Sequence, residues 1–163
     1  MAKKILITGP KTNICQEFKS ILSNNHSINY IEIGSGQDDN YKHNIDLSNM
    51  DQIDNNTDLI RSCDKIVLAH GILGTERFLH YNEKTILHSV KVNLLSFIRI
   101  IEIAIKYNSN VRIAVIGSES GIKGSFDISY SLSKAALHKY IEERKILSPT
   151  QQLICIAPSM IVD

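Results

Sequence analysis

Residues 111–121 read VRIAVIGSESG, an apolar, β-branched run that ends abruptly in small polar residues. The apolar part has the length and composition of a buried strand, and Gly117 with the serines after it is typical of a turn. In open α/β sheets, ligands bind at the carboxyl ends of the parallel strands. The stretch therefore predicts a buried strand that delivers Ser118 to the ligand-binding edge of a sheet.

Longer helical stretches alternate with this run and with others like it. The expected strands are residues 4–8, 28–33, 43–47, 65–69, 111–117 and 152–156, apolar on both faces or nearly so. The expected helices are residues 13–23, 48–61, 83–107 and 129–147. This alternation predicts an α/β fold, a Rossmann-type doubly wound parallel sheet of about six strands with helices on both faces. Only the polar connection 33–43 is too short for an ordinary crossover helix, so we expect a loop there.

Composition restricts the class of protein. The chain has 163 residues, 43% of them hydrophobic, and we expect residues 1–163 to form a single domain around one core. Lys and Arg number 18 against 17 Asp and Glu, which gives no basic surface for nucleic acid. The longest apolar run, residues 96–105, is too short for a bilayer span, and the first residues do not resemble a secretory signal. We therefore expect a cytoplasmic protein that binds neither nucleic acid nor a membrane.

The three cysteines, Cys15, Cys63 and Cys155, are widely spaced and form no Cys-x-x-Cys pair. This pattern indicates neither a disulfide framework nor a zinc site. Buried thiols are the expectation, and no metal site is predicted.

A tyrosine and a lysine stand four residues apart, in the segment SYSLSKAAL (129–137), which has the pattern of a helix start. Tyr130 and Lys134 then share one helix face, and a nearby ammonium favours the phenolate form that acid/base chemistry needs. The spacing alone is weak evidence, because Tyr140 and Arg144 repeat it and a plain surface contact explains an isolated pair. The spacing becomes stronger evidence beside Ser118, which the preceding strand is expected to place at the ligand-binding edge.

The order Ser118-Glu119-Ser120-Gly121, then Tyr130 and Lys134, resembles the active-site signature of the short-chain dehydrogenases/reductases. The likeness extends along the chain. Asn93 matches a helix asparagine of the family, and Gly71 is the one residue kept from its Asn-Asn-Ala-Gly strand end. Asp46-Leu47 matches a segment that contacts adenine, and Pro158 lies where the family often has Pro-Gly.

This resemblance implies a role for each matched residue. Tyr130 is the expected general acid/base, Ser118 binds the substrate oxygen, Lys134 holds the nicotinamide ribose and Asn93 supports a proton-relay water. The implied cofactor-binding residues are Gly9, Lys11, Asn13, Ile14, Asp46, Leu47, Gly71, Lys134 and Pro158. Simpler interpretations stay open: Ser118 can merely end a strand, and Asp46 can cap the helix near Ser48. An amide in a largely apolar helix, as at Asn93, needs buried partners, which favours a functional role.

The loop after the first strand departs from the family pattern Thr-Gly-x-x-x-Gly-x-Gly. Here the sequence is TGPKTNIC (8–15), so Asn13 and Cys15 replace two glycines and only Gly9 remains. We expect Asn13 to adopt a left-handed backbone, since asparagine tolerates it best among the other residues, and Cys15 to be small enough to fit. Lys11 can offer a charge to phosphates. The residues after the second strand, Gly34-Ser35-Gly36, do not discriminate NAD from NADP.

The leading hypothesis is an NAD(P)-dependent oxidoreductase that acts on a secondary alcohol or ketone, a small-molecule substrate. The alternative is a catalytically silent relative, or a truncated chain with a binding or assembly role, because the family's usual C-terminal substrate-binding segment is missing after Asp163. Epimerases and dehydratases of nucleotide sugars share the Tyr-x-x-x-Lys spacing and are a weaker third possibility. Apolar residues on more than one face of helix 83–107 predict a homodimer or homotetramer through helices 83–107 and 129–147.

Overall fold

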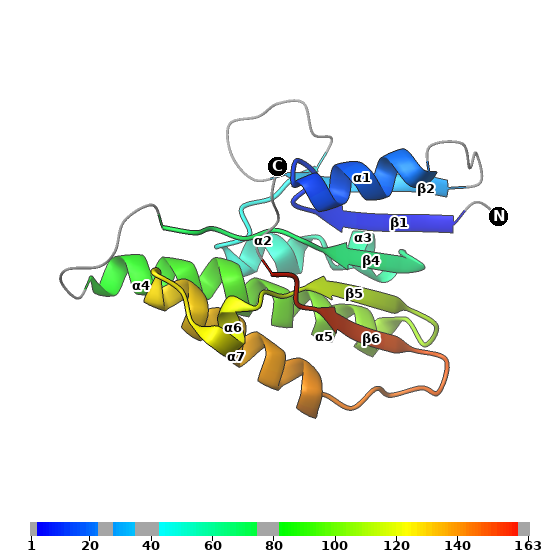
Figure 1. The fold of residues 1–163 in the computed structure, drawn as a ribbon. Helices are drawn as coiled ribbons and strands as arrows, with labels where there is room; N and C mark the ends of the chain where they lie inside the picture. The colour runs from blue at the N-terminus through cyan, green and yellow to red at the C-terminus, as the bar shows by residue number, and fades with distance from the viewer. Residues whose placement is uncertain (1–2, 23–27, 35–42, 75–81, 160–163) are drawn as a thin grey trace.

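A computed structural model describes residues 3–22, 28–34, 43–74 and 82–159, and it contains the expected parallel sheet (Figure 1). The strands are β1 Lys3–Thr8, β2 Ile28–Gly34, β3 His43–Asn44, β4 Lys65–Leu68, β5 Arg112–Ile116 and β6 Gln152–Ile156. They pair in parallel in the order β3-β2-β1-β4-β5-β6. This is the Rossmann order, with its switch point between β1 and β4, and it confirms the predicted fold class.

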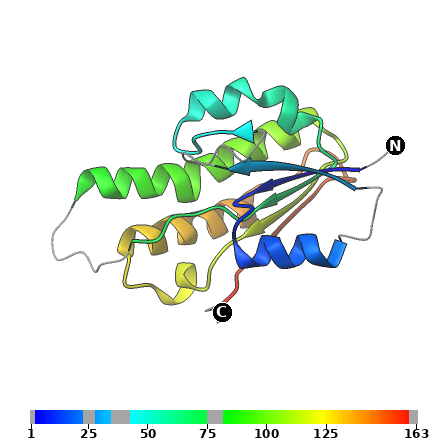
Figure 2. The ribbon, with the colours of Figure 1, turned by 90° about the horizontal axis from the view of Figure 1, so that it is seen from above.

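Helices lie on both faces of the sheet. They are α1 Asn13–Leu22, α2 Met50–Asn55, α3 Thr57–Arg61, α4 Glu83–Val90, the π-helical segment η1 Lys91–Leu95, α5 Ser96–Tyr107, α6 Ser120–Lys123 and α7 Ile128–Glu143. Figure 2 shows α1 on one side of the sheet and α2 and α3 on the other. Among these described helices, none has the length and apolar character needed to cross a bilayer.

The core consists of two clusters, one on each face. The larger cluster lies under α2, α3, α5 and α7, and α5 alone contributes Phe97, Ile100, Ile101, Ile103, Ala104 and Ile105. These positions repeat every three to four residues, as expected for the buried face of a helix. Burial of each large apolar side chain contributes roughly 1.5–3 kcal/mol to the free energy of folding. The smaller cluster joins Cys15 of α1 to Ile5, Ile7 and Val67. Cys15 and Cys63 are buried as expected, whereas Cys155 is only half-buried.

Several expected elements differ in detail. The expected helix 48–61 is two helices, because Asn56 leaves the helical conformation between α2 and α3, with φ −105° and ψ 19°. The expected helix 83–107 is continuous in sequence but changes to π-helical winding at Lys91–Leu95. α7 ends at Glu143 instead of Leu147, β3 ends at Asn44, and the short helix α6 was not expected. The loop expected at 33–43 falls largely at 35–42, outside the described residues.

β6 contradicts the expectation that every strand is covered on both faces. Leu153 packs on the larger core cluster, so Ile154 and Ile156 face the opposite side of the sheet. They are 53% and 51% exposed, because the described core on that side contains helical residues from α1 only. Among the described residues, β6 is therefore the last strand of the sheet, and one of its apolar faces is not covered.

Candidate active site

Tyr130 and Lys134 lie one turn apart near the start of α7, as their spacing predicted. Lys134 Nζ lies 5.7 Å from the centroid of the Tyr130 ring and 4.6 Å from that of Phe97 on α5. It donates a hydrogen bond of 3.2 Å to the carbonyl oxygen of Ile116 at the end of β5. Lys134 is only 2% exposed, and this burial lowers its pKa to about 8. The structure thus brings the phenol and the ammonium together at the carboxyl end of β5.

Ser118 lies just after β5 and lines the same cleft as Tyr130, a space of about 800 Å³ that we call the Ser118 cleft. The Ser118 hydroxyl accepts a hydrogen bond of 3.1 Å from the Ser120 backbone N–H. Three of the expected cofactor-binding residues, Asn13, Ile14 and Pro158, line this cleft as well. The predicted acid/base and substrate-binding residues therefore face the same space as part of the predicted cofactor site.

Asn93 lies in η1 and is fully buried. Its Nδ2 donates to the carbonyl oxygen of Ile72 and to Ser89 Oγ, and its Oδ1 accepts from the Ile72 backbone N–H, all at 2.9 Å. A Cβ placed on Gly71 would lie 3.1 Å from Asn93 Oδ1 and 4.0 Å from Lys134 Nζ. Gly71 and Asn93 therefore lie beside Lys134. The oxygen and one amide proton of Asn93 hold the loop that follows β4, and the other amide proton bonds Ser89 on α4. π-Helical segments of this kind are frequent at functional sites.

The loop after β1 comes very close to the end of β4. Gly9 has φ +67°, and a Cβ there would lie 2.8 Å from the backbone of Ala69 and of His70. The remaining glycine of the family pattern is thus required by both conformation and space. Asn13 does not take the left-handed conformation expected of it: no described residue other than glycine has a positive φ, and Asn13 is the first residue of α1. Cys15 fits as expected, fully buried under α1.

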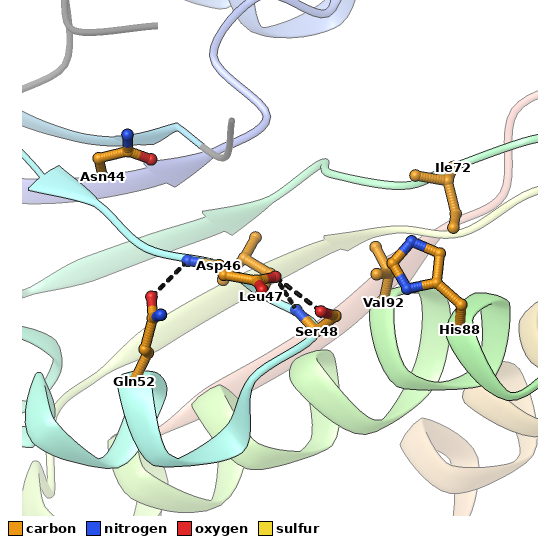
Figure 3. Close-up of a pocket in the computed structure, with 8 residues that line it drawn as sticks. All are labelled: Asn44, Asp46, Leu47, Ser48, Gln52, Ile72, His88 and Val92. Atoms are coloured by element: carbon orange, nitrogen blue, oxygen red, sulfur yellow. Dashed lines mark hydrogen bonds between the residues drawn. The ribbon is translucent and has the colours of Figure 1, made fainter. Parts of the chain in front are cut away.

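Asp46 and Leu47 line a second pocket of about 510 Å³, shown in Figure 3. Asp46 Oδ1 accepts hydrogen bonds from Ser48 N and Ser48 Oγ at 2.8 and 2.7 Å. The N-cap of α2 is Asn49, so Asp46 shapes the turn before the helix and is not its cap. Ile72 and Val92 form the opposite wall.

The two cavities lie at the same edge of the sheet. The second pocket lies beyond the end of β3, and the Ser118 cleft lies beyond the end of β5. Strand order places the end of β1, with Gly9, between them. Lys11, which is exposed, lines neither cavity.

A buried histidine that the sequence did not single out connects the two halves of this edge. His70 Nδ1 lies 2.6 Å from Thr8 Oγ1, and His70 Nε2 lies 2.7 Å from Ser96 Oγ. Ser96 Oγ donates to the Val92 carbonyl oxygen, so it must accept from His70 Nε2–H, and Nδ1 then accepts from the Thr8 hydroxyl. Burial, with the nearby Lys134 ammonium, lowers the pKa of His70 to about 3 and keeps the ring neutral. Only its position at the end of a buried strand could have suggested this role.

His138, one turn after Lys134 on α7, was also missed. Its Nε2 accepts a hydrogen bond of 3.3 Å from the Ser118 backbone N–H. A Cβ on Gly117 would lie 2.3 Å from this nitrogen, and one on Gly121 would lie 3.0 Å from His138 Cε1. The two glycines thus leave a slot for the ring, and burial together with Lys134 lowers its pKa, which maintains the neutral acceptor. Within the described ranges, no group of His, Cys, Asp or Glu is arranged to hold a metal ion.

The comparison with family models identifies the chain. The model of the short chain dehydrogenases matches residues 3–161. The chain belongs to the short-chain dehydrogenases. A comparison with curated proteins finds no match to this dehydrogenase chain.

Several solved structures have a fold similar to that of this chain. A short-chain dehydrogenase family protein from Francisella tularensis has 24% identity and a TM-score of 0.71; the match covers 86% of this chain and 62% of that protein. A protein from Listeria innocua has 16% identity and a TM-score of 0.82, over 98% of this chain and 79% of that one. A 4-hydroxyisoleucine dehydrogenase complexed with NADH has 28% identity and a TM-score of 0.69, over 86% of this chain and 67% of that one. This dehydrogenase chain thus spans less than two thirds of the Francisella protein's length.

Proposed function

We propose that this short-chain dehydrogenase binds NAD or NADP along the edge that joins its two cavities and interconverts a secondary alcohol and a ketone. The observation that supports this most is the shared cleft of Ser118 and Tyr130, with Lys134 directly behind it. When bound, the nicotinamide would give or take the hydride. The chain's own residues would bind the substrate oxygen and move the proton.

The residues at the centre of this edge suit a dinucleotide. Gly9 lets the loop after β1 lie directly against the backbone of Ala69 and His70, which places the start of α1 at this edge of the sheet. Asn13 and Ile14 begin α1, and the N-terminus of a helix favours a phosphate group. Asp46 and Leu47 would hold the adenosine end, and Pro158 would border the nicotinamide end. Bound NADH in the 4-hydroxyisoleucine dehydrogenase and bound NADPH in the structural match BdcA are consistent with either cofactor.

The proton chemistry would belong to Tyr130. Its hydroxyl would donate a proton to the oxygen of a ketone, or accept one from an alcohol, while Ser118 Oγ holds the same oxygen. The ammonium of Lys134, 5.7 Å from the centroid of the Tyr130 ring, would be a positive charge near the phenolate that remains after donation. Its bond to Ile116 keeps the ammonium at this position.

Turnover tests the proposal. A panel of ketones is incubated with NADH and with NADPH, and absorbance of the reduced nicotinamide is followed for the wild type and for Tyr130→Phe. We expect oxidation of one cofactor by the wild type and a loss of at least about a hundredfold in Tyr130→Phe, the range of a lost general acid. Equal turnover by the two proteins would contradict the role of Tyr130.

A second candidate function follows from one residue at this edge that differs from the family pattern. Asn13 places a side chain in the cleft where the family has glycine, and this favours a catalytically silent protein with a binding or assembly role. Such a protein would bind the dinucleotide weakly or not at all and would turn over no ketone. Turnover that disappears in Tyr130→Phe counts against it.

We further propose a homodimer or homotetramer through α4–α5 and α7. Leu87 and Leu95 before α5, and Ile128 and Leu132 on α7, are 41–59% exposed, although all four are large apolar side chains. Covering them is favourable by roughly 25 cal/mol for each Å² removed from water. Light scattering at micromolar concentration should give a multiple of 18.3 kDa; a monomeric mass would contradict the proposal.

A further inference from the structure

The side chain of Asp127 joins two segments that lie far apart in sequence. Asp127 Oδ2 accepts a hydrogen bond of 2.6 Å from the backbone N–H of Gly74, in the loop after β4. Oδ1 accepts from Ser129 Oγ at 2.6 Å and from the backbone N–H of Tyr130 at 3.0 Å. Figure 2 shows this loop passing the first turn of α7. One carboxylate therefore connects the loop to the turn that carries Tyr130.

The environment explains why a carboxylate stays charged there at 2% exposure. Burial by itself raises the pKa of Asp127, but hydrogen bonds from the Ser129 hydroxyl and from the N–H groups of Tyr130 and Gly74 outweigh it, so the pKa lies below its usual value. The position at the N-terminus of a 16-residue helix favours negative charge further. A Cβ on Gly74 would lie only 2.9 Å from Asp127 Oδ2, so a larger residue there would displace the carboxylate.

A second side chain holds the same loop two residues earlier. Asn93 bonds both the N–H and the carbonyl oxygen of Ile72, and Asp127 bonds the N–H of Gly74. Leu73 lies between these two anchors, lines the Ser118 cleft and is 52% exposed. The half-exposed Leu73 is therefore held in the wall of the Ser118 cleft by one side-chain anchor on each side.

We propose that Asp127 is a positioning residue, which sets Tyr130 on α7 and Leu73 after β4 in a fixed arrangement across the Ser118 cleft. Capping of α7 alone would need one oxygen, whereas the second oxygen is used for the loop. The catalytic consequence rests on the proposed function: a substrate held against Leu73 presents its oxygen to Tyr130 only while the two walls stay in register. Loss of the Gly74 contact should then impair catalysis while α7 stays capped.

Two substitutions separate capping from positioning. Asp127→Ser keeps a favoured capping hydroxyl for the Tyr130 N–H but is too short for Gly74. Asp127→Asn keeps one accepting oxygen and turns its amide donors toward the Gly74 N–H. Asp51→Ser, an exposed acid in the first turn of α2, is the matched control. The chain contains no tryptophan, so Leu73→Trp provides a single fluorescent reporter in each background.

Acrylamide quenching of the introduced indole and steady-state kinetics give the result. We expect both Asp127 variants to at least double the quenching constant and to lower kcat tenfold or more, with NADH affinity within threefold of wild type and the control unchanged. Unchanged quenching overturns the proposal, as does wild-type kcat in Asp127→Ser, which would leave capping as the only role. If the wild type binds no NADH and reduces no ketone, the proposed function fails, while quenching still decides whether Asp127 anchors the loop.

Discussion

The two halves of the sheet edge that carries both cavities resemble the family pattern in different places. At β5 and α7, the sequence resembles the family at Ser118, Tyr130 and Lys134. His138 accepts a hydrogen bond from the Ser118 N–H, Asp127 accepts one from the Tyr130 N–H, and Lys134 donates one to Ile116. At β1 and α1, only Gly9 remains of the glycine pattern, yet the loop still comes within contact distance of β4. The close approach of the loop to the end of β4 therefore depends on Gly9, whereas the other two glycine positions accept the first residue of α1 and a buried thiol.

The largest loss of stability is expected at Gly9, the one glycine of the family pattern that remains in the loop after β1. Gly9→Ala should destabilise the protein by roughly 2–4 kcal/mol, because alanine at φ +67° is strained and its Cβ would lie 2.8 Å from the Ala69 backbone. For a chain of this length this corresponds to a fall in Tm of about 5–15 °C. Thermal unfolding by circular dichroism measures it. A fall below about 2 °C would show that the loop can move away from β4.

His70, which connects the two halves, should make stability depend on pH. Its folded pKa of about 3 lies below the unfolded value of 6.5, so the unfolded chain binds the proton first. Stability is therefore lost as the pH falls from 6.5 toward 3, by up to roughly 3 kcal/mol at pH 4. Urea unfolding at stepwise pH should show this slope in the wild type. His70→Gln should be less stable at pH 7 and have a flatter profile; equal slopes in the two proteins would refute the assignment.

Lys134 should make stability rise with pH as His70 does, but in a window at higher pH. Its folded pKa of about 8 lies below the ordinary 10.5, so the folded protein releases the proton first and stability rises between pH 8 and 10.5. Lys134→Met removes the cost of burying the ammonium and should stabilise the protein at pH 7 by about 1–2 kcal/mol, while NADH binding weakens. Urea unfolding at pH 7 and pH 10 measures both the rise in wild-type stability with pH and the effect of the substitution at pH 7. A destabilised Met variant would mean that the bond to Ile116 outweighs desolvation.

The smallest effect, a change in NADH affinity, is expected from restoring the family's glycine at position 13. Asn13→Gly removes an exposed side chain from the cleft and should raise NADH affinity two- to fivefold, with less than about 1 kcal/mol lost in stability. Glu17→Gly, on the exposed side of the same helix, is the control and should weaken α1 without affecting NADH. Calorimetric titration compares the two. If neither variant changes the affinity, Asn13 does not obstruct the ligand.

The sequence predicted what depends on local pattern. β-Branched runs and their spacing gave the strands, and the Tyr130–Lys134 interval placed both groups on one face of α7. Contacts between distant segments decided the rest: the π-helical winding at Asn93 accompanies its bonds to Ile72, and the neutral state of His70 depends on Thr8 and Ser96. Asp127 could have been recognised as a favoured cap before an apolar helix, but its bond to Gly74 spans 53 residues. The open face of β6 follows from the lack of described core helices other than α1 on that side.

Calorimetric titration of the wild-type protein with NADH and with NADPH tests the central claim most directly, that the edge from Asp46 past Gly9 to Ser118 accepts a dinucleotide. We expect saturable binding of at least one of them with a Kd below 1 mM, a free energy of binding more favourable than about −4 kcal/mol. No detectable binding of either cofactor at millimolar concentration would contradict it.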